Sequence, residues 1–209
     1  MADLTLFTNP MSRGRIARWM LEELGEPYET RIVNYGPEMK SPEYRAINPM
    51  GKVPALKHGD VVVTEGAAIC AYVADAFADK GLAPEPGSSD RASYYRWLFF
   101  CAGPVEQAVT NTNLGFVVPE ERERMVGYGS KKLVLDTLEG FLENREFITG
   151  KFSAADVYVG AQVIWGLQFG TFDSRPAFEA YAGRLRERPA YKRATEIDEK
   201  LTAEIQARG

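Results

Sequence analysis

The spacing of apolar residues predicts a strand followed by a helix at the start of the chain. Leu4–Phe7 is a short apolar and β-branched run that ends at Asn9-Pro10. Apolar residues then recur at helical spacing up to Gly25, a stop signal, and these residues are Ile16, Trp19, Met20 and Leu24. The next predicted elements are a strand at Tyr28–Val33 and a short helix that begins at Ser41. Two strands, Val53–Leu56 and Val61–Val63, and a helix over Thr64–Asp79 follow.

This order of elements, β-α-β-α-β-β-α, is typical of a thioredoxin-like domain, in which a crossover helix joins the first two strands as parallel neighbours. We therefore expect residues 1–80 to form a thioredoxin-like α/β domain. Residues 81–88 are rich in Pro and Gly and predict a linker. Strand signals nearly vanish beyond it, so residues 89–209 are expected to be all-helical. The helices predicted there are Ser89–Asn113, Pro119–Asn144, Ser153–Phe169, Arg175–Glu187 and Ala190–Gln206.

One helix start in the second half has a clear capping pattern. Ser153 can cap the helix while Asp156, three residues later, reaches back to the amide of the cap, and Phe152 and Val157 stand at the staple positions. A catalytic Asp156 is the alternative, and the matching pattern favours the cap.

Composition and charge exclude several classes of protein. The 209 residues carry 25 Lys and Arg against 29 Asp and Glu, a formal net charge of −4. Such a chain has no general attraction for nucleic acid or anionic membranes, no apolar run spans a bilayer, and the N-terminus lacks a signal-peptide pattern. Two cysteines, Cys70 and Cys101, and one histidine, His58, predict neither a disulfide framework nor a metal site. We expect a cytoplasmic protein without metal, nucleic-acid or membrane partners, with both cysteines buried.

Ser12 is the first candidate for chemistry. It stands at the turn between the predicted first strand and first helix, beside the first amides of the helix and the positive end of its dipole. A thiol brought to that place would be favoured as the thiolate. The alternative is that Ser12 only caps the helix, and local chemistry alone favours the cap.

Asn48–Pro54 is the second candidate. Pro54 stands at a strand start, where a cis bond can expose the amide and carbonyl of Val53 for pairing with an extended peptide. Lys52 could neutralise a carboxylate of that peptide. A plain turn with a solvated lysine is the alternative.

Glu65-Gly66, at the start of the helix predicted over Thr64–Asp79, is the third candidate. Amides at the helix start would hold a small carboxylate and Glu65 would suit an ammonium group, although Glu65 could equally serve the helix dipole alone. Together the three sites describe a pocket for a short peptide with a thiol, carboxylates and an amine. Glutathione fits that description.

Four motifs, in this order, resemble those of the cytosolic glutathione S-transferase family, and in particular its bacterial and fungal members. They are Ser12–Gly25 with Pro27-Tyr28-Glu29, Asn48–Leu56, Thr64–Tyr72 and Gly150–Asp156. The motifs span most of the chain, which makes the resemblance far more specific than any one of them. It implies a homodimeric detoxification enzyme with a serine-type active site, which adds the sulfur of its co-substrate glutathione to a small hydrophobic electrophile, with some peroxide reduction.

The resemblance also implies roles for single residues. Ser12 would hydrogen-bond the glutathione thiolate, and Val53, beside cis-Pro54, would pair through its backbone with the cysteinyl part. Lys52 would lie near the glycyl end. The γ-glutamyl end would be held by two further groups, the Glu65 side chain and the Gly66 amide. Asn9 is a further expected glutathione contact.

Two departures from the family pattern bear on this site. The family usually has Ser or Thr after the glutamate, so Gly66 loses one hydrogen bond to glutathione, worth ~1 kcal/mol. The tyrosine that several animal classes use is absent from the first strand, which leaves Ser12 as activator, with Asn9 or Thr8 as outside candidates. No cysteine stands at Met11-Ser12, which argues against thiol transfer by an enzyme cysteine.

A site for an apolar electrophile would need apolar side chains near the sulfur. The candidates are Met11, Tyr94, Trp97, Phe100 and Phe116. Two other functions stay open, a non-catalytic glutathione-binding stress or adaptor protein, and a glutathione-dependent isomerase or dehalogenase.

Overall fold

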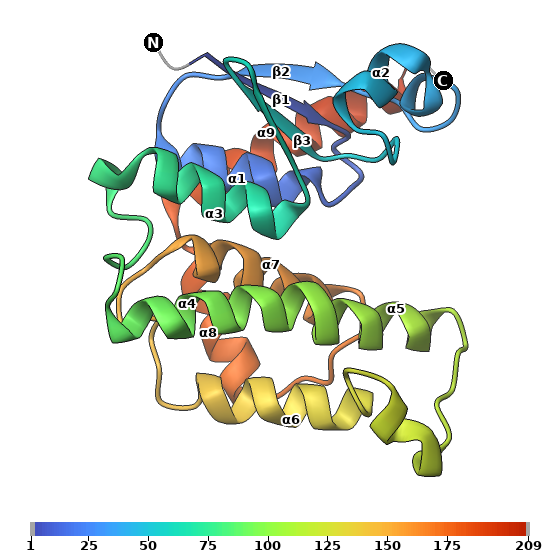
Figure 1. Cartoon of the computed structure of the whole chain (residues 1–209), viewed down its shortest axis with the longest axis vertical. Coiled ribbons are helices and arrows are strands. Elements are labelled where there is room, and N and C mark those ends of the chain that lie inside the picture. The colour runs from blue at the N-terminus through green and yellow to red at the C-terminus, as the bar shows by residue number, and fades with distance from the viewer. Residues whose placement is uncertain (1–2, 208–209) are drawn as a thin grey trace. The chain divides into compact units, whose positions relative to one another are not determined.

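The computed structural model describes residues 3–207; residues 1, 2, 208 and 209, at the outer ends of the two predicted domains, lie outside the described residues. The chain divides into two compact units, Met1–Leu82 with Arg186–Gly209 and Ala83–Leu185. Figure 1 shows a sheet with helices in the first unit and helices in the second. Within the described residues, no helix is both long and apolar enough to cross a membrane.

The first unit contains a mixed sheet in the order β2-β1-β3-β4. Its strands are β1 (Leu4–Thr8), β2 (Glu29–Ile32), β3 (Ala55–His58) and β4 (Val61–Thr64). β1 pairs in parallel with β2, with Leu6 opposite Thr30, and antiparallel with β3, with Leu6 opposite Leu56. The parallel pair requires the crossover helix that the sequence predicts, so the thioredoxin-like fold is confirmed.

Helices complete this unit. They are α1 (Gly14–Leu24), α2 (Pro42–Ile47), α3 (Gly66–Ala76) and α9 (Pro189–Gln206), with a 3-10 turn at Glu38–Lys40. α1 ends at Gly25, whose φ of 72° lies in the left-handed region. The side chain of Ser41 accepts a hydrogen bond from the Tyr44 amide and caps α2, as its position before Pro42 predicts.

The last helix belongs to the first unit, which differs from the boundary expected from the sequence. α9 packs along α1, where Arg18 and Asp198 form an ion pair of 2.7 Å with both side chains 1% exposed. Arg188 forms a second ion pair with Glu23, at 2.7 Å. These pairs join residues more than 160 positions apart, so helical periodicity alone could not assign α9 to this unit.

The second unit is helical, as expected, but two predicted helices are interrupted. Its α-helices are α4 (Ser89–Phe100), α5 (Glu106–Asn113), α6 (Lys131–Leu142), α7 (Ala154–Gln168) and α8 (Pro176–Arg186). A π-helical turn, Cys101–Val105, with Pro104 inside it, separates α4 from α5. The single helix predicted over Pro119–Asn144 is wrong. A 3-10 helix, Glu120–Met125, is followed by Gly129 at a φ of 64°, and α6 begins only after it.

The start of α7 confirms the capping interpretation of Asp156. Its fully buried carboxylate accepts hydrogen bonds from the amides of Ser153 (2.9 Å) and Ile148 (2.8 Å), from the Ser153 hydroxyl (3.1 Å) and from the Tyr181 hydroxyl (2.8 Å). Burial raises the pKa of Asp156 to about 6. The carboxylate therefore joins α7, α8 and the preceding loop within the core of the second unit.

Candidate functional site

A cavity of about 730 Å³ in the first unit brings together three segments that are far apart in the sequence. They come from the loop before α1, the segment after β2 and the loop before β3. The residues that line it are Met11, Ser12, Arg13, Tyr35, Gly36, Pro37, Met39, Lys40, Gly51, Lys52 and Val53. The cavity thus contains Met11, Ser12, Lys52 and Val53, four of the residues predicted from the sequence.

Ser12 caps the turn that leads into α1. Its hydroxyl accepts a hydrogen bond from the Gly14 amide at 2.9 Å and donates its only proton to the Asn9 carbonyl at 2.6 Å. The amides of Arg15 and Ile16 donate to the carbonyls of Ser12 and Arg13. Ser12 lines the cavity, but an anion there would receive the hydroxyl proton only if the bond to Asn9 were broken.

Asn9 and Thr8, the other side chains predicted at this turn, are both buried. The Asn9 side chain donates to the Val33 carbonyl (3.2 Å) and accepts from the Met11 amide (3.0 Å), so both of its polar groups hold the loop. Thr8 is fully buried beneath Gly14. Both residues therefore shape the loop around Ser12, and neither lines the cavity.

Val53 lines the cavity, and its bond to Pro54 is cis. Within the described chain, the N–H and the C=O of Val53 have no intramolecular hydrogen-bond partner. The loop before it is held firmly, because the Lys52 carbonyl accepts from the Tyr44 hydroxyl (2.7 Å) and from the Asn48 side chain (2.8 Å). Burial raises the pKa of Tyr44 to about 12, so this hydroxyl remains a donor at neutral pH.

The cavity is cationic although the chain as a whole is acidic. Arg13, Lys40 and Lys52 line it, and none of the described residues in its lining is Asp or Glu. The Lys40 ammonium donates to the carbonyls of Gly51 (2.6 Å) and Met50 (3.1 Å), which ties the segment after β2 to the loop before β3. Such a lining favours a ligand with carboxylates.

Sequence reasoning missed Arg13, Tyr35 and Lys40 in this cavity. One signal could have found the last two. Parallel strands end at the same edge of a sheet, so the segment after β2 had to lie beside the turn that follows β1.

Glu65 and Gly66 lie between β4 and α3, where Glu65 has a φ of 66°. A non-glycine residue in this region carries strain of ~1–3 kcal/mol, and such strain is typical of functional sites. The Glu65 side chain is exposed. Of the described residues, those that line the cavity do not include Glu65, Gly66 or Pro54.

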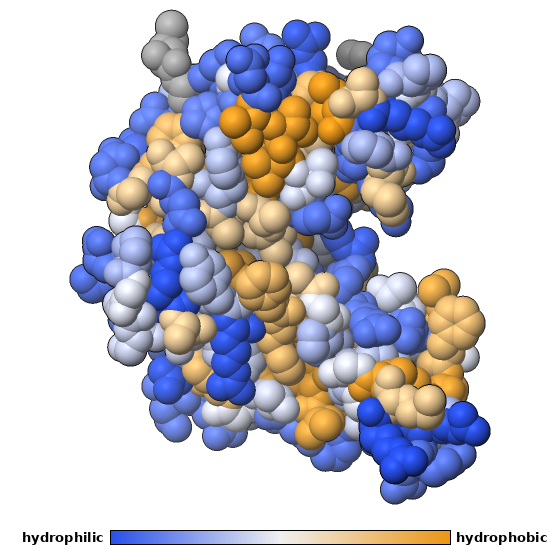
Figure 2. Space-filling view, viewed as in Figure 1, coloured by the Kyte–Doolittle hydropathy of each residue, from blue (hydrophilic) through white to orange (hydrophobic). Residues whose placement is uncertain are grey.

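The residues expected to form an apolar substrate site differ in exposure. Tyr94 and Trp97 are buried and belong to the core of the second unit. Phe100 packs against Trp97, with the ring centroids 5.1 Å apart. Phe116 is exposed. Figure 2 shows apolar side chains gathered at the end of α5 and over the segment that follows, where Leu114 and Val117 are also exposed. The fifth candidate, Met11, is exposed at the cavity described above.

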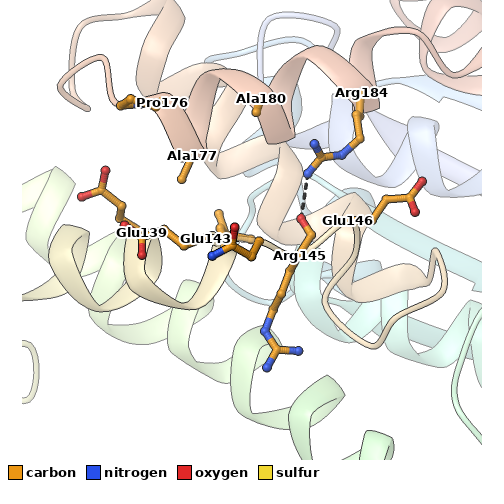
Figure 3. A pocket seen from close by; sticks show the side chains of 10 residues that line it. Glu139, Glu143, Arg145, Glu146, Pro176, Ala177, Ala180 and Arg184 are labelled. Carbon is orange, nitrogen blue, oxygen red and sulfur yellow. Dashed lines mark hydrogen bonds between the residues drawn. The ribbon is translucent and has the colours of Figure 1, made fainter.

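A second cavity, of about 510 Å³, lies in the second unit between the end of α6 and α8. Figure 3 shows Pro176, Ala177 and Ala180 on the α8 side, with three glutamates and Arg145 opposite them. Arg184 donates to the Arg145 carbonyl at 2.8 Å, and both residues line the cavity. No predicted site residue lines it. Nor do the described residues contain three or more His, Cys, Asp or Glu placed to hold a metal ion.

Comparison with known proteins identifies relatives of this chain. Residues 11–76 match the family model for the glutathione S-transferase N-terminal domain. Glutathione S-transferase A of Pleuronectes platessa is 30% identical over 184 residues, 83% of this chain and 82% of the relative. A glutathione S-transferase of Escherichia coli O157:H7 is 30% identical over 171 residues, 78% of each chain. A glutathione transferase of Phanerochaete chrysosporium, solved with oxidized glutathione, superposes with a TM-score of 0.79 at 27% identity, covering 97% of this chain and 98% of that one.

Proposed function

Since this chain belongs to the glutathione S-transferase family, we propose that its cationic cavity binds glutathione and that the enzyme adds the glutathione sulfur to small hydrophobic electrophiles. The observation that carries the proposal is the meeting of Ser12, Lys52 and the unpaired Val53 backbone in one cavity. A hydroxyl, a cation and a free peptide edge match the thiol, the carboxylate and the backbone of a tripeptide.

The Val53 backbone would bind the middle of the tripeptide. Its N–H and C=O can pair with the cysteinyl C=O and N–H in the manner of an added strand. These hydrogen bonds depend on no side chain, and Tyr44 and Asn48 hold the loop in place through the Lys52 carbonyl. Binding should therefore tolerate replacement of any single cavity side chain.

Charged groups would bind the two ends. Lys52 and Lys40 support the glycyl carboxylate, because both line the cavity next to Val53. Glu65, held at a positive φ, would meet the γ-glutamyl ammonium while the Gly66 amide meets its carboxylate.

The reaction would proceed from the thiolate. The thiol loses its proton to water, and the sulfur then forms a bond to an electrophilic carbon while the leaving group departs with its bonding electrons. Ser12 would stabilise the thiolate by turning its hydroxyl from the Asn9 carbonyl to the sulfur. With two glutathione molecules and a hydroperoxide, the same thiolate would yield the disulfide, an alcohol and water.

Two measurements on the full-length protein test this function. Calorimetry should detect glutathione binding, and a chromogenic aryl halide should be conjugated at a rate that falls in Ser12→Ala. Ser130→Ala is the matched control, because Ser130 caps α6 in the second unit and its loss removes a cap without touching the cavity. Full turnover in Ser12→Ala would refute the role of Ser12, and absence of glutathione binding in the wild type would refute the function.

A non-catalytic glutathione-binding protein is the second candidate function. One observation favours it, since the Ser12 proton is already donated to the Asn9 carbonyl at 2.6 Å. Such a protein would be retained on a glutathione resin and released by free glutathione, yet would conjugate none of a panel of aryl halides, epoxides and hydroperoxides. Conjugation of any of these substrates above the uncatalysed rate would exclude it.

The homodimer is a further part of the proposal. Light scattering coupled to size-exclusion chromatography should give twice the mass of one chain. A mass equal to one chain at micromolar concentration would contradict it.

A further inference from the structure

We propose that the Tyr35 hydroxyl is a further hydrogen-bond donor to the glutathione sulfur, which makes Tyr35 a catalytic residue in addition to Ser12. This inference rests on the proposed function, because it assumes that the thiolate lies in the cavity that both residues line.

The position of Tyr35 follows from the sheet. β1 and β2 are parallel, so the turn after β1, which carries Met11 and Ser12, lies at the same edge as the segment after β2, which carries Tyr35. The Tyr35 hydroxyl donates to the Met11 carbonyl at 3.2 Å, and both residues line the cavity. It therefore lies beside the peptide that joins Met11 to Ser12.

The segment that carries Tyr35 is anchored on both sides. The amide and the side-chain nitrogen of Asn34 both donate to the Glu38 carboxylate, at 3.1 and 2.7 Å. Lys40 then bridges to the Gly51 carbonyl at 2.6 Å. The backbone near Tyr35 is thus held at the cavity, while its side chain is 56% exposed and has room to turn about its own bonds.

The two hydroxyls differ in how tightly their protons are held. Both hydroxyls donate to a backbone carbonyl. The distance from Ser12 Oγ to the Asn9 oxygen, 2.6 Å, is short for such a hydrogen bond, whereas the distance from Tyr35 Oη to the Met11 oxygen, 3.2 Å, is long. Tyr35 therefore gives up less than Ser12 when its proton turns to an anion. A hydrogen bond to a thiolate is charge-assisted and stronger than the neutral bond it would replace.

Other donors at the cavity are better placed for carboxylates. Lys40 is bonded to two carbonyls of the loop before β3, and Lys52 lies in that same loop. A phenol has a further property that suits a sulfur, since it donates a proton without adding a charge that would attract the carboxylates instead. Tyr35 is accordingly the neutral donor best placed to complement Ser12.

Tyr35→Phe in the full-length enzyme tests this role, because it removes one oxygen atom and keeps the ring. Loss of a hydrogen bond to a charged group predicts a fall in kcat/KM near neutral pH of about 10- to 100-fold. Ultraviolet absorbance of the bound thiolate should appear at a pH about 1–2 units higher than in the wild type. Glutathione affinity at low pH, where the thiol is protonated in both proteins, should change less than about threefold.

Tyr95→Phe is the matched control, because Tyr95 is another exposed tyrosine, on α4 in the second unit, and is bonded to Arg91. Its thiolate titration and kcat/KM should equal those of the wild type. A Tyr35→Phe enzyme with an unshifted thiolate titration and unchanged kcat/KM would overturn the inference while leaving the function intact. A wild-type protein that binds no glutathione would instead refute the function on which the inference rests.

Discussion

Adding one methyl group at Gly14 should destabilise the turn that holds Ser12. A Cβ at Gly14 would lie 1.9 Å from Thr8 Oγ1, 3.0 Å from Thr8 Cβ and 3.1 Å from Ser12 Oγ. Thr8 has little freedom to withdraw, because it is fully buried at the end of β1 and its carbonyl accepts from the Val33 amide at 2.8 Å. Gly14→Ala therefore requires a displacement of about 1 Å in closely packed surroundings.

The size of the effect follows from opposing contributions. Overpacking of a buried site costs ~1–3 kcal/mol, and the better helix propensity of alanine offsets at most ~1 kcal/mol. We expect Gly14→Ala to lower the free energy of unfolding by ~1–2 kcal/mol. Thr8→Ala should be nearly neutral, because the Thr8 hydroxyl is buried without a hydrogen-bond partner in the described part of the chain and its removal offsets the lost methyl packing.

A double-mutant cycle measured by urea unfolding isolates the contact. In the Thr8→Ala background the oxygen that the new Cβ would meet is gone, so Gly14→Ala should cost at least ~1 kcal/mol less than in the wild type. Additive effects of the two substitutions, or a neutral Gly14→Ala, would refute the close contact between β1 and the start of α1.

Three further outcomes are expected. Asp198→Asn should lower the free energy of unfolding, measured with urea, by ~3–5 kcal/mol, because it leaves Arg18 charged and buried. Replacing both Arg18 and Asp198 by apolar residues should lower it by less. The pKa of Asp156 is raised in the folded state, so its contribution to stability is complete below about pH 4 and is lost as the pH rises through about 6. From pH 4 to 7, the free energy of unfolding of the wild type should therefore fall by up to ~3 kcal/mol relative to that of Asp156→Asn. A rise over this range would contradict the prediction. Cys70 and Cys101 are fully buried, which raises the pKa of each thiol, so mass spectrometry should find them alkylated only after unfolding.

Elements with strong local signals were predictable from the sequence. The apolar spacing ending at Gly25 defines α1, and the Ser153–Asp156 pattern defines the start of α7. The break within the segment Pro119–Asn144 was not. The Pro119–Asn144 segment has a helical composition, yet its first half forms only a 3-10 helix and the α-helix starts after Gly129. Propensity alone does not decide where such a segment breaks.

The candidate site was predicted only in part, because some of its residues stand in turns with a sequence signal and others do not. Ser12, Lys52 and Val53 stand in recognisable turns, and the structure brings them into one cavity. Tyr35 and Lys40 lie in a polar segment without periodicity, and only the parallel pairing of β1 and β2 brings them to the cavity. A polar residue in a turn can either face a ligand or hold the loop, and the sequence does not distinguish these two roles for Asn9. Its bonds to Val33 and Met11 show that it holds the loop.

Binding of glutathione in this cavity, along the Val53 backbone, is tested by a crystal structure of the protein with glutathione. We expect two hydrogen bonds between Val53 and the cysteinyl backbone, with the sulfur within hydrogen-bond distance of Ser12 Oγ or Tyr35 Oη. Glutathione bound elsewhere, or paired with Val53 but with its sulfur pointing away from both hydroxyls, would contradict it.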